Sequence, residues 1–248
     1  MIAALPAAEP VEDLTALGFV AFTTTRDAGS FGTATDEPVG DVMGRWNALT
    51  AALDARGVGR LATAAQVHGA RVITHAPGWS GWLRAPGADG HACPPTPATA
   101  AAVMVADCVP VFLAHPSGAC ALLHSGWRGT EARIVEAGIA ALAALACPPR
   151  DLTLHLGPAV CGRCYEVSPD VHARLTGRAV VRPTPVDLRA LIAGHARAQG
   201  VIRISTSRWC TRCDNERFFS HRAGDAGRQI AVLAFPSVRS LDSPTHIL

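Results

Sequence analysis

Lysine is absent from the chain, so all 22 of its basic residues are arginine. This absence excludes a Walker A lysine for nucleotide phosphates and a lysine that forms a Schiff base with a carbonyl substrate. Phosphate or carboxylate binding would therefore have to use arginine, backbone N–H groups or a metal ion.

Charge is also scarce, at 17% of residues and a formal net charge of +2. Without a block of basic residues, we expect no nucleic-acid partner. No apolar run is as long as a membrane span, and the segment MIAALPAAEPVEDL lacks the basic start of a signal peptide. We therefore expect no membrane partner and a cytoplasmic location. The hydrophobic content of 49% over 248 residues is ample for a packed core.

Short apolar runs alternate with helical patterns, which predicts a single α/β domain over residues 1–248. Residues 76–100 are rich in Gly, Pro and Ala, which predicts a long exposed loop. Helices are expected after a cap at Asp41, at 131–146 after a cap at Thr130, and at 186–200. The expected strands are 70–75, 101–106, 109–115, 120–124, 152–156, 201–206 and 229–235.

Three side chains stand next to expected strands and suit a metal ion: His68, Cys108 and His124. Strand ends joined by glycine-rich loops are where α/β folds tend to place chemistry. Two imidazoles and one thiolate suit zinc, and three protein ligands leave a fourth position for water, as in catalytic sites. The alternative is that each histidine makes an ordinary hydrogen bond and that Cys108 is a core residue.

The stretch HSGWRGTEAR (124–133) leads from a strand into an expected helix through a glycine-containing loop. Free N–H groups at such a helix start favour an anion, and Arg128 adds a bidentate donor suited to phosphate. The alternative is a surface arginine in a tight turn, with Trp127 as packing.

Eight cysteines occur in a chain without an export signal, so thiols or metal ligands are expected rather than disulfides. Four of them form the pairs CGRC (161–164) and CTRC (210–213). The 45 residues between the pairs exceed the usual zinc-ribbon spacing of about 15–20. A closed site of four cysteines is a rival to the His/Cys site if the fold brings the pairs together.

Five blocks resemble, in order and spacing, the bacterial laccase-domain family. These blocks are QVHGARV (66–72), ADCVPVFLA (106–114), LLHSGWRGT (122–130), LGPAVCGRCYEVSPDV (156–171) and CTRCDNERFFSHRAGDAGRQIAVL (210–233). Members have been described as polyphenol oxidases, as multifunctional purine nucleoside phosphorylases and as peptidoglycan editing factors. The match extends from about residue 20 over nearly the whole chain.

The resemblance implies a three-layer α/β/β sandwich with mixed sheets that carries zinc, or copper, on His68, Cys108 and His124. It also implies phosphorolysis of adenosine, inosine, guanosine and methylthioadenosine, together with deamination of adenosine. The partners would then be purine nucleosides and phosphate, and the protein would be a monomer or homodimer.

Phosphorolysis needs a phosphate dianion held under the sugar, together with stabilisation of charge as the C–N bond breaks. Candidates are Arg128, the helix start after Gly129, and Ser220 with Arg222. Deamination needs a metal-activated water and a group for proton transfer, for which Asp107 is the candidate. Its alternative role is to cap a loop.

Two further candidates for substrate binding depend on the resemblance. Gln66 opens the QVHG block. The family usually has an Asn-Arg pair in the first helix, whereas this chain has Arg45-Trp46-Asn47, so Arg45 is shifted or its role is lost. The late block also differs, with Ser220-His221-Arg222-Ala223 where the family usually has an aromatic residue and two arginines.

Three other functions are weighed against this one. A multicopper oxidase needs many histidines, typically in H-x-H pairs, whereas this chain has 10 histidines and no such pair; bound copper could still give weak oxidation. A cysteine hydrolase or amidase would use Cys108 as nucleophile with His124 or His68 as base. A non-enzymatic binding protein would use zinc on the two CxxC pairs.

Overall fold

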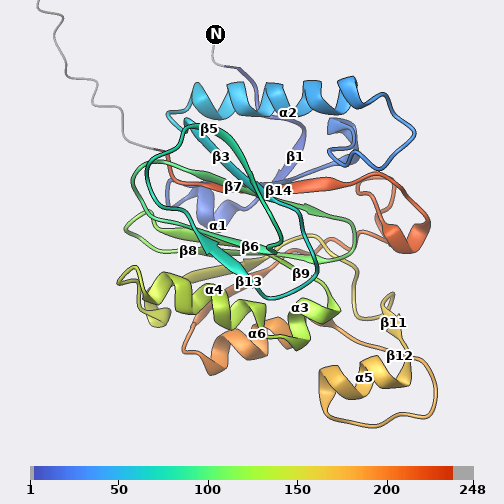
Figure 1. The fold of residues 1–248 in the computed structure, drawn as a ribbon. Coiled ribbons are helices and arrows are strands. Elements are labelled where there is room, and N and C mark those ends of the chain that lie inside the picture. Colours follow the sequence, from blue (N-terminus) through green and yellow to red (C-terminus); the bar gives the residue numbers. More distant parts are fainter. Residues whose placement is uncertain (1–2, 237–248) are drawn as a thin grey trace, which may run out of the picture.

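The computed structural model describes residues 3–236. Two six-stranded mixed sheets pack face to face, and helices cover their outer faces (Figure 1). Both sheets contribute to one apolar layer between them, in which β7 and β14 of the first sheet meet β8 and β9 of the second.

The first sheet has the order β1-β2-β14-β7-β3-β5. Its first four strands are antiparallel neighbours, and β3 pairs in parallel with both β7 and β5. In that order the strands span Ala8–Pro10, Val20–Thr24, Gln229–Ala234, Ala100–Val105, Arg60–Ala64 and Gly81–Ala85.

The second sheet has the order β13-β10-β8-β9-β6-β4. The inner pairs are antiparallel, whereas β13 and β4 join the two edges in parallel. In that order the strands span Arg203–Thr206, Thr153–Leu156, Val109–Ala114, Cys120–Ser125, Gly90–Cys93 and Val72–Thr74. A small hairpin-like pair, β11 (Glu166–Val167) with β12 (Thr184–Pro185), stands apart from both sheets.

Strand β8 shows why the central runs are continuously apolar. Phe112 and Ala114 belong to the layer between the sheets, while Val111 and Leu113 pack on the opposite face with α4 (Ile134–Ala143) and α6 (Leu188–Ala198). All six residues of β8 are buried. A strand covered on both faces has no polar side, so it reads as an unbroken hydrophobic run.

The remaining helices are α1 (Glu12–Thr15), α2 (Val39–Asp54), α3 (Trp127–Glu131) and α5 (Pro169–Thr176). Short 3-10 turns lie at Arg26–Ala28, Pro149–Asp151 and His221–Ala223. Helix α2 covers the outer face of the first sheet with Trp46 and Leu49 (Figure 1). The expected α/β class with mixed sheets is confirmed, and α2 adds a helix on the side opposite α4 and α6. Within residues 3–236 no helix is long and apolar enough to cross a membrane.

Residues 76–100 are not the exposed loop that their composition predicts. They contain β5 and β6, and all four residues of β6 are buried. Gly90 marks close packing rather than a turn, because a Cβ there would lie 2.7 Å from Leu123 Cδ2 and 2.9 Å from Val72 Cγ2. A glycine required by close packing has the same letter as a glycine in a loop, so composition misled the prediction here.

Two expected helix starts are also wrong. Helix α2 begins at Val39 after Pro38, which leaves Asp41 in the first turn instead of at the cap. Thr130 lies inside the five-residue helix α3, and Arg133, with a left-handed φ of 58°, separates α3 from α4. The helix predicted at 131–146 is therefore two helices, and the helix start in this stretch lies after Gly126 instead of after Gly129.

Candidate metal centre and active site

Side chains from both sheets meet at the candidate centre. His68 lies between β3 and β4, Cys108 lies between β7 and β8, and His124 is on β9. One ligand atom from each lies within 4.8 Å of the other two. His68 has a φ of 60° and Asp107 a φ of 80°, values that are uncommon outside glycine. Strained backbone of this kind is concentrated at functional sites.

Asp89, which precedes β6, organises two of these ligands. Its Oδ1 lies 2.9 Å from His124 Nδ1. The same carboxylate accepts backbone N–H groups from Val67, His68 and Gly69 at 3.2, 2.9 and 2.7 Å. Because Nδ1 of His124 is directed to Asp89, Nε2 is the nitrogen available to a metal. One buried carboxylate thus orients His124 and fixes the loop that carries His68.

The pKa values of Cys108 and His124 are set by the residues around them in the cluster. Burial would raise the pKa of the Cys108 thiol, but His124 and His68 oppose it and lower the pKa to about 6. Burial would lower the pKa of His124, yet Cys108 and Asp89 raise the pKa to about 9. The cluster therefore favours a thiolate at neutral pH, which is the form that binds metals.

Gly126 leaves space for the sulfur. A Cβ at this position would lie 2.9 Å from Cys108 Sγ and 3.5 Å from His68 Cδ2. Its φ of −81° and ψ of −173° are open to any residue, so the requirement for glycine here is steric.

Cavities open on both sides of the cluster. One, of about 290 Å³, is lined by His68, Cys108 and Trp127 together with Arg128, Tyr165 and Arg222. The other, of about 480 Å³, also contacts His68 and Cys108 and is lined in addition by His124, Arg84 and Arg228. His221 lines both cavities. The cluster is thus accessible from two directions.

The first cavity carries two arginines that were predicted from sequence. Arg128 is exposed, and its Cζ lies 4.4 Å from the centre of the Trp127 ring. Arg222 donates from Nη1 to the Glu166 carbonyl at 2.9 Å and lies over Tyr165 at 4.7 Å. Burial and the neighbouring Cys108 raise the pKa of Tyr165, so its hydroxyl stays protonated and able to donate.

The predicted role of Ser220 in phosphate binding does not fit its contacts. Ser220 is fully buried, and its hydroxyl donates to Asp107 Oδ1 at 2.8 Å. Asp107 also accepts from Thr211 Oγ1 at 2.6 Å and from the Arg222 backbone N–H at 2.7 Å. With three donors on its carboxylate, Asp107 holds loops together, which is the alternative role that the sequence left open.

The chain matches the family model described as multi-copper polyphenol oxidoreductase laccase over residues 24–236. It belongs to this laccase family. A Deinococcus radiodurans protein named purine nucleoside phosphorylase is 35% identical over 188 residues, which cover 69% of the chain and 68% of that protein. The protein named purine nucleoside phosphorylase ORF3 from Streptomyces griseus is 37% identical over 137 residues, covering 52% and 56%. The match spans little more than half the length of the Streptomyces relative.

Solved structures show the same fold. YlmD from Geobacillus stearothermophilus superposes with a TM-score of 0.77 at 26% identity, covering 89% of this chain and 93% of that one. The Bacillus licheniformis hypothetical protein YfiH gives a TM-score of 0.78 at 21% identity, covering 93% and 97%. The fold of this chain is therefore shared, over most of its length, with both of these solved structures.

Two further predicted substrate residues have other partners in this laccase-family chain. Gln66 lines the second cavity, but its side chain donates to the Met104 carbonyl at 2.8 Å and accepts the Met104 N–H at 2.7 Å. It joins the ends of β3 and β7. Arg45 does not line either cavity; it donates to the Ser30 carbonyl at 2.7 Å and pairs with Glu37. In this chain, where Arg45 precedes Trp46 and Asn47, the arginine thus lies outside both cavities.

Several residues of the site were missed by sequence reasoning. Asp89 lies in the segment assigned to a loop, and Gly126 differs from other glycines only in its neighbours. Arg84 lines the second cavity without belonging to a motif, and His221 lines both cavities but was given no role within the late block. The signal that the sequence offered for Asp89 was an acidic residue between Gly87 and Gly90.

Proposed function

We propose that this laccase-family chain is a zinc-dependent purine nucleoside phosphorylase. The proposed substrates are adenosine, inosine, guanosine and methylthioadenosine, with deamination of adenosine as a second activity. The observation that carries the proposal is the His68–Cys108–His124 cluster beside a cavity with two arginines. The names of the relatives support the same reaction.

Phosphate is assigned to the cavity that Arg128 and Arg222 line. A guanidinium offers paired N–H donors to phosphate oxygens, and the stacking of Arg128 on Trp127 limits its motion. In phosphorolysis a phosphate oxygen bonds to C1′ of the ribose as the bond from C1′ to the purine nitrogen breaks. The products are the free base and ribose 1-phosphate, and the developing negative charge on the base must be stabilised.

The donor set fits a metal ion. Cys108 has a lowered thiol pKa, His124 has its Nδ1 held by Asp89, and Gly126 leaves room at the sulfur. Two imidazoles and a thiolate suit zinc, which would act there as a Lewis acid with one position open to substrate. Copper binds such donors more tightly in the Irving–Williams order, so the metal has to be measured.

Around that position, the chain supplies hydrogen-bond donors. The Tyr165 hydroxyl and the exposed His221 line the first cavity with the two arginines. Tyr165 is assigned to binding and orienting the substrate as a neutral donor. Asp107 is assigned to positioning of the loop before Cys108, so no proton transfer is attributed to it.

The proposal is tested by metal analysis of the purified protein beside His68→Ala, Cys108→Ala and His124→Ala. Each sample is assayed for adenine and ribose 1-phosphate from adenosine with phosphate, and for inosine without phosphate. We expect each of the three variants to lose the zinc ion of this cluster together with product formation. Adenine release that persists without phosphate, or any product formation without metal, would contradict the proposal. Inosine as the sole product would restrict the activity to deamination.

A cysteine hydrolase is the second candidate, because the Cys108 pKa of about 6 also suits a nucleophile. The two functions differ in their response to a thiol alkylator. Zinc on Cys108 protects it, so the loaded enzyme should resist alkylation. Rapid alkylation of Cys108 in an active, metal-free protein would favour the hydrolase.

A further inference from the structure

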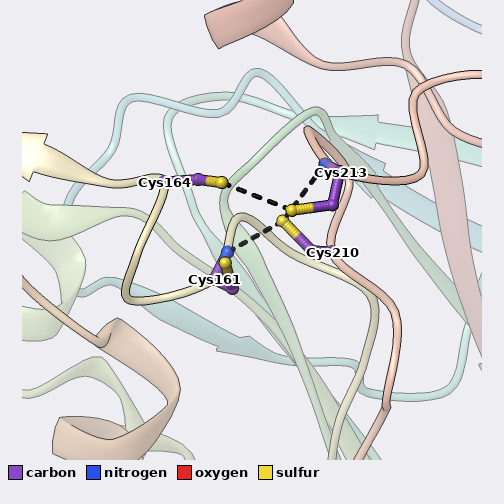
Figure 2. Close-up of side chains that lie close together, drawn as sticks. All are labelled: Cys161, Cys164, Cys210 and Cys213. Carbon is purple, nitrogen blue, oxygen red and sulfur yellow. Dashed lines mark hydrogen bonds between the residues drawn. The ribbon is translucent and has the colours of Figure 1, made fainter.

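Four cysteines form a second cluster, outside the candidate active site. Cys161 and Cys164 follow β10, and Cys210 and Cys213 follow β13. The four sulfur atoms lie within 4.8 Å of one another. In Figure 2 the side chains from the two loops gather around one point.

The sheet explains how pairs 45 residues apart come together. Strands β10 and β13 are parallel neighbours, so the loops that follow them begin at the same end of the sheet. An isolated bridge joins Ala159 to Cys210, and the Thr211 N–H donates to the Ala159 carbonyl at 3.2 Å. The two cysteine pairs are therefore far apart in sequence but follow adjacent strands.

Backbone groups in both loops are directed at sulfur. Cys210 Sγ accepts the N–H of Cys161 at 3.2 Å and that of Cys213 at 3.4 Å (Figure 2). Such donors stabilise a thiolate. All four thiols are free, with Cys164 and Cys213 sulfur atoms 3.4 Å apart.

Each loop also contains one arginine, Arg163 in CGRC and Arg212 in CTRC. Arg212 donates to the Cys164 carbonyl at 3.2 Å. A zinc ion on four thiolates would carry two net negative charges, and the guanidinium of Arg212 lies beside one of the four cysteines. Gly162 lets the first loop pack closely, since a Cβ there would lie 2.8 Å from Asp187 Cβ at the start of α6.

We propose that Cys161, Cys164, Cys210 and Cys213 hold a second zinc ion in a closed, structural site of four thiolates. Four sulfur donors from two CxxC turns are the arrangement of structural zinc. With every position taken by protein, this ion has no place for a substrate, in contrast to the three-ligand centre.

The second zinc supports a wall of the candidate active site. Tyr165 follows Cys164 directly and lines the first cavity. Thr211, between Cys210 and Cys213, donates to Asp107 at 2.6 Å, and the Val160 N–H donates to the Asp107 carbonyl at 3.1 Å. Crosslinking the two loops by zinc thus stabilises the loop before Cys108. Metal binding of this kind also stabilises the folded chain.

The test separates the two sites. The protein with His68→Ala, Cys108→Ala and His124→Ala retains all four clustered cysteines. We expect it to keep one zinc of the parent's two, with X-ray absorption showing four sulfur neighbours at about 2.3 Å. Cobalt in its place should give the strong sulfur-to-metal charge-transfer bands of a four-thiolate site.

Cys161→Ser with Cys210→Ser is expected to lose the other zinc and to melt at a lower temperature. Cys147→Ala, which removes a buried cysteine that belongs to neither cluster, is the control and should keep both ions. A triple variant without metal would overturn the proposal, as would iron with sulfide, or a mass showing the four cysteines as disulfides. These outcomes do not depend on nucleoside turnover, so failure here leaves the proposed function standing.

Discussion

The carboxylate of Asp89 and the imidazole of His124 form a buried pair, with 2.9 Å between Oδ1 and Nδ1. The two residues are 35 positions apart and lie on adjacent antiparallel strands or their ends, β6 and β9. The backbone repeats the link, because the His124 N–H donates to the Asp89 carbonyl at 2.7 Å. The pair fixes which nitrogen of His124 faces the centre.

Asp89→Asn should weaken zinc binding at the three-ligand centre. The amide keeps the shape but removes the charge that holds His124, and partners of this kind typically contribute about 10–100-fold in metal affinity. Competition with a chelator measures the loss, and the exposed Asp36→Asn is the control. An unchanged zinc affinity would show that Asp89 only fixes the loop at 67–69.

Gly126→Ala should also weaken zinc binding at the three-ligand centre, because the added methyl group would contact Cys108. Its new Cβ would lie 2.9 Å from Cys108 Sγ, so the sulfur has to move. We expect a loss of about 10–100-fold in zinc affinity, similar to that for other changes that reorient ligands.

Gly194→Ala in α6 is the matched control, because its Cβ would meet nothing within 4 Å. It should keep zinc and raise stability by about 0.4–1 kcal/mol. Equal zinc affinity in the Gly126 and Gly194 variants would contradict the steric argument.

Ser220→Ala separates a structural role from phosphate binding. The change removes one of three donors to a buried carboxylate, which we expect to destabilise the fold by about 1–3 kcal/mol. The KM for phosphate should stay close to that of the parent. Thermal unfolding and phosphate kinetics are measured beside the exposed Ser80→Ala. A raised KM with an unchanged melting temperature would restore the phosphate role.

Acid should destabilise the protein through a second buried pair, in which His75 Nε2 lies 2.9 Å from His91 Nδ1. Burial, aided by Arg60, lowers the pKa of His75 to about 4, and burial with His75 lowers that of His91 to about 3. The unfolded chain takes up protons from about pH 6.5 downwards, whereas the folded pair does not. Stability is therefore complete above pH 6.5 and is lost as the pH falls towards 4.

Urea unfolding at pH 7.5 and 4.5 measures this loss, on the order of 1–3 kcal/mol for each histidine. His75→Gln with His91→Gln should flatten the dependence, and His115→Gln should not. The comparison between variants at each pH isolates the pair from acid release of metal. If the double variant and the His115 variant lose the same unfolding free energy between pH 7.5 and 4.5, the acid sensitivity does not come from this pair.

The sequence predicts best the parts of this fold that depend on local pattern. Strand β8 is apolar throughout because both of its faces are covered, and the match with residues 109–115 is close. The three candidate ligands were found because each stands beside a strand. Strand β6 (Gly90–Cys93) escaped prediction, since three of its four residues are small and its burial depends on neighbours from β4 and β9.

Roles decided by long-range contacts could not be predicted. Ser220 and Thr211 look like free hydroxyls in sequence, yet both donate to Asp107, more than 100 positions earlier. The cysteine pairs seemed too far apart for one site, because sequence spacing does not reveal that β10 and β13 are neighbours. At these positions the residue type indicated that the side chain would bind a partner, but the identity of that partner depended on how the strands are arranged in the sheets.

Arg128→Ala tests the assignment of the first cavity to phosphate. The side chain is exposed beside Trp127, and a charge-assisted pair of hydrogen bonds to phosphate is worth about 1.5–3 kcal/mol. We expect the KM for phosphate to rise about 10- to 100-fold, with zinc content unchanged. Arg174→Ala is the matched control: its Cζ lies 5.1 Å from the same ring, but the residue pairs with Glu131 and does not line the cavity. If both variants raise the KM equally, the effect comes from the packing of Trp127, and phosphate has to be assigned to the second cavity, beside Arg84 and Arg228.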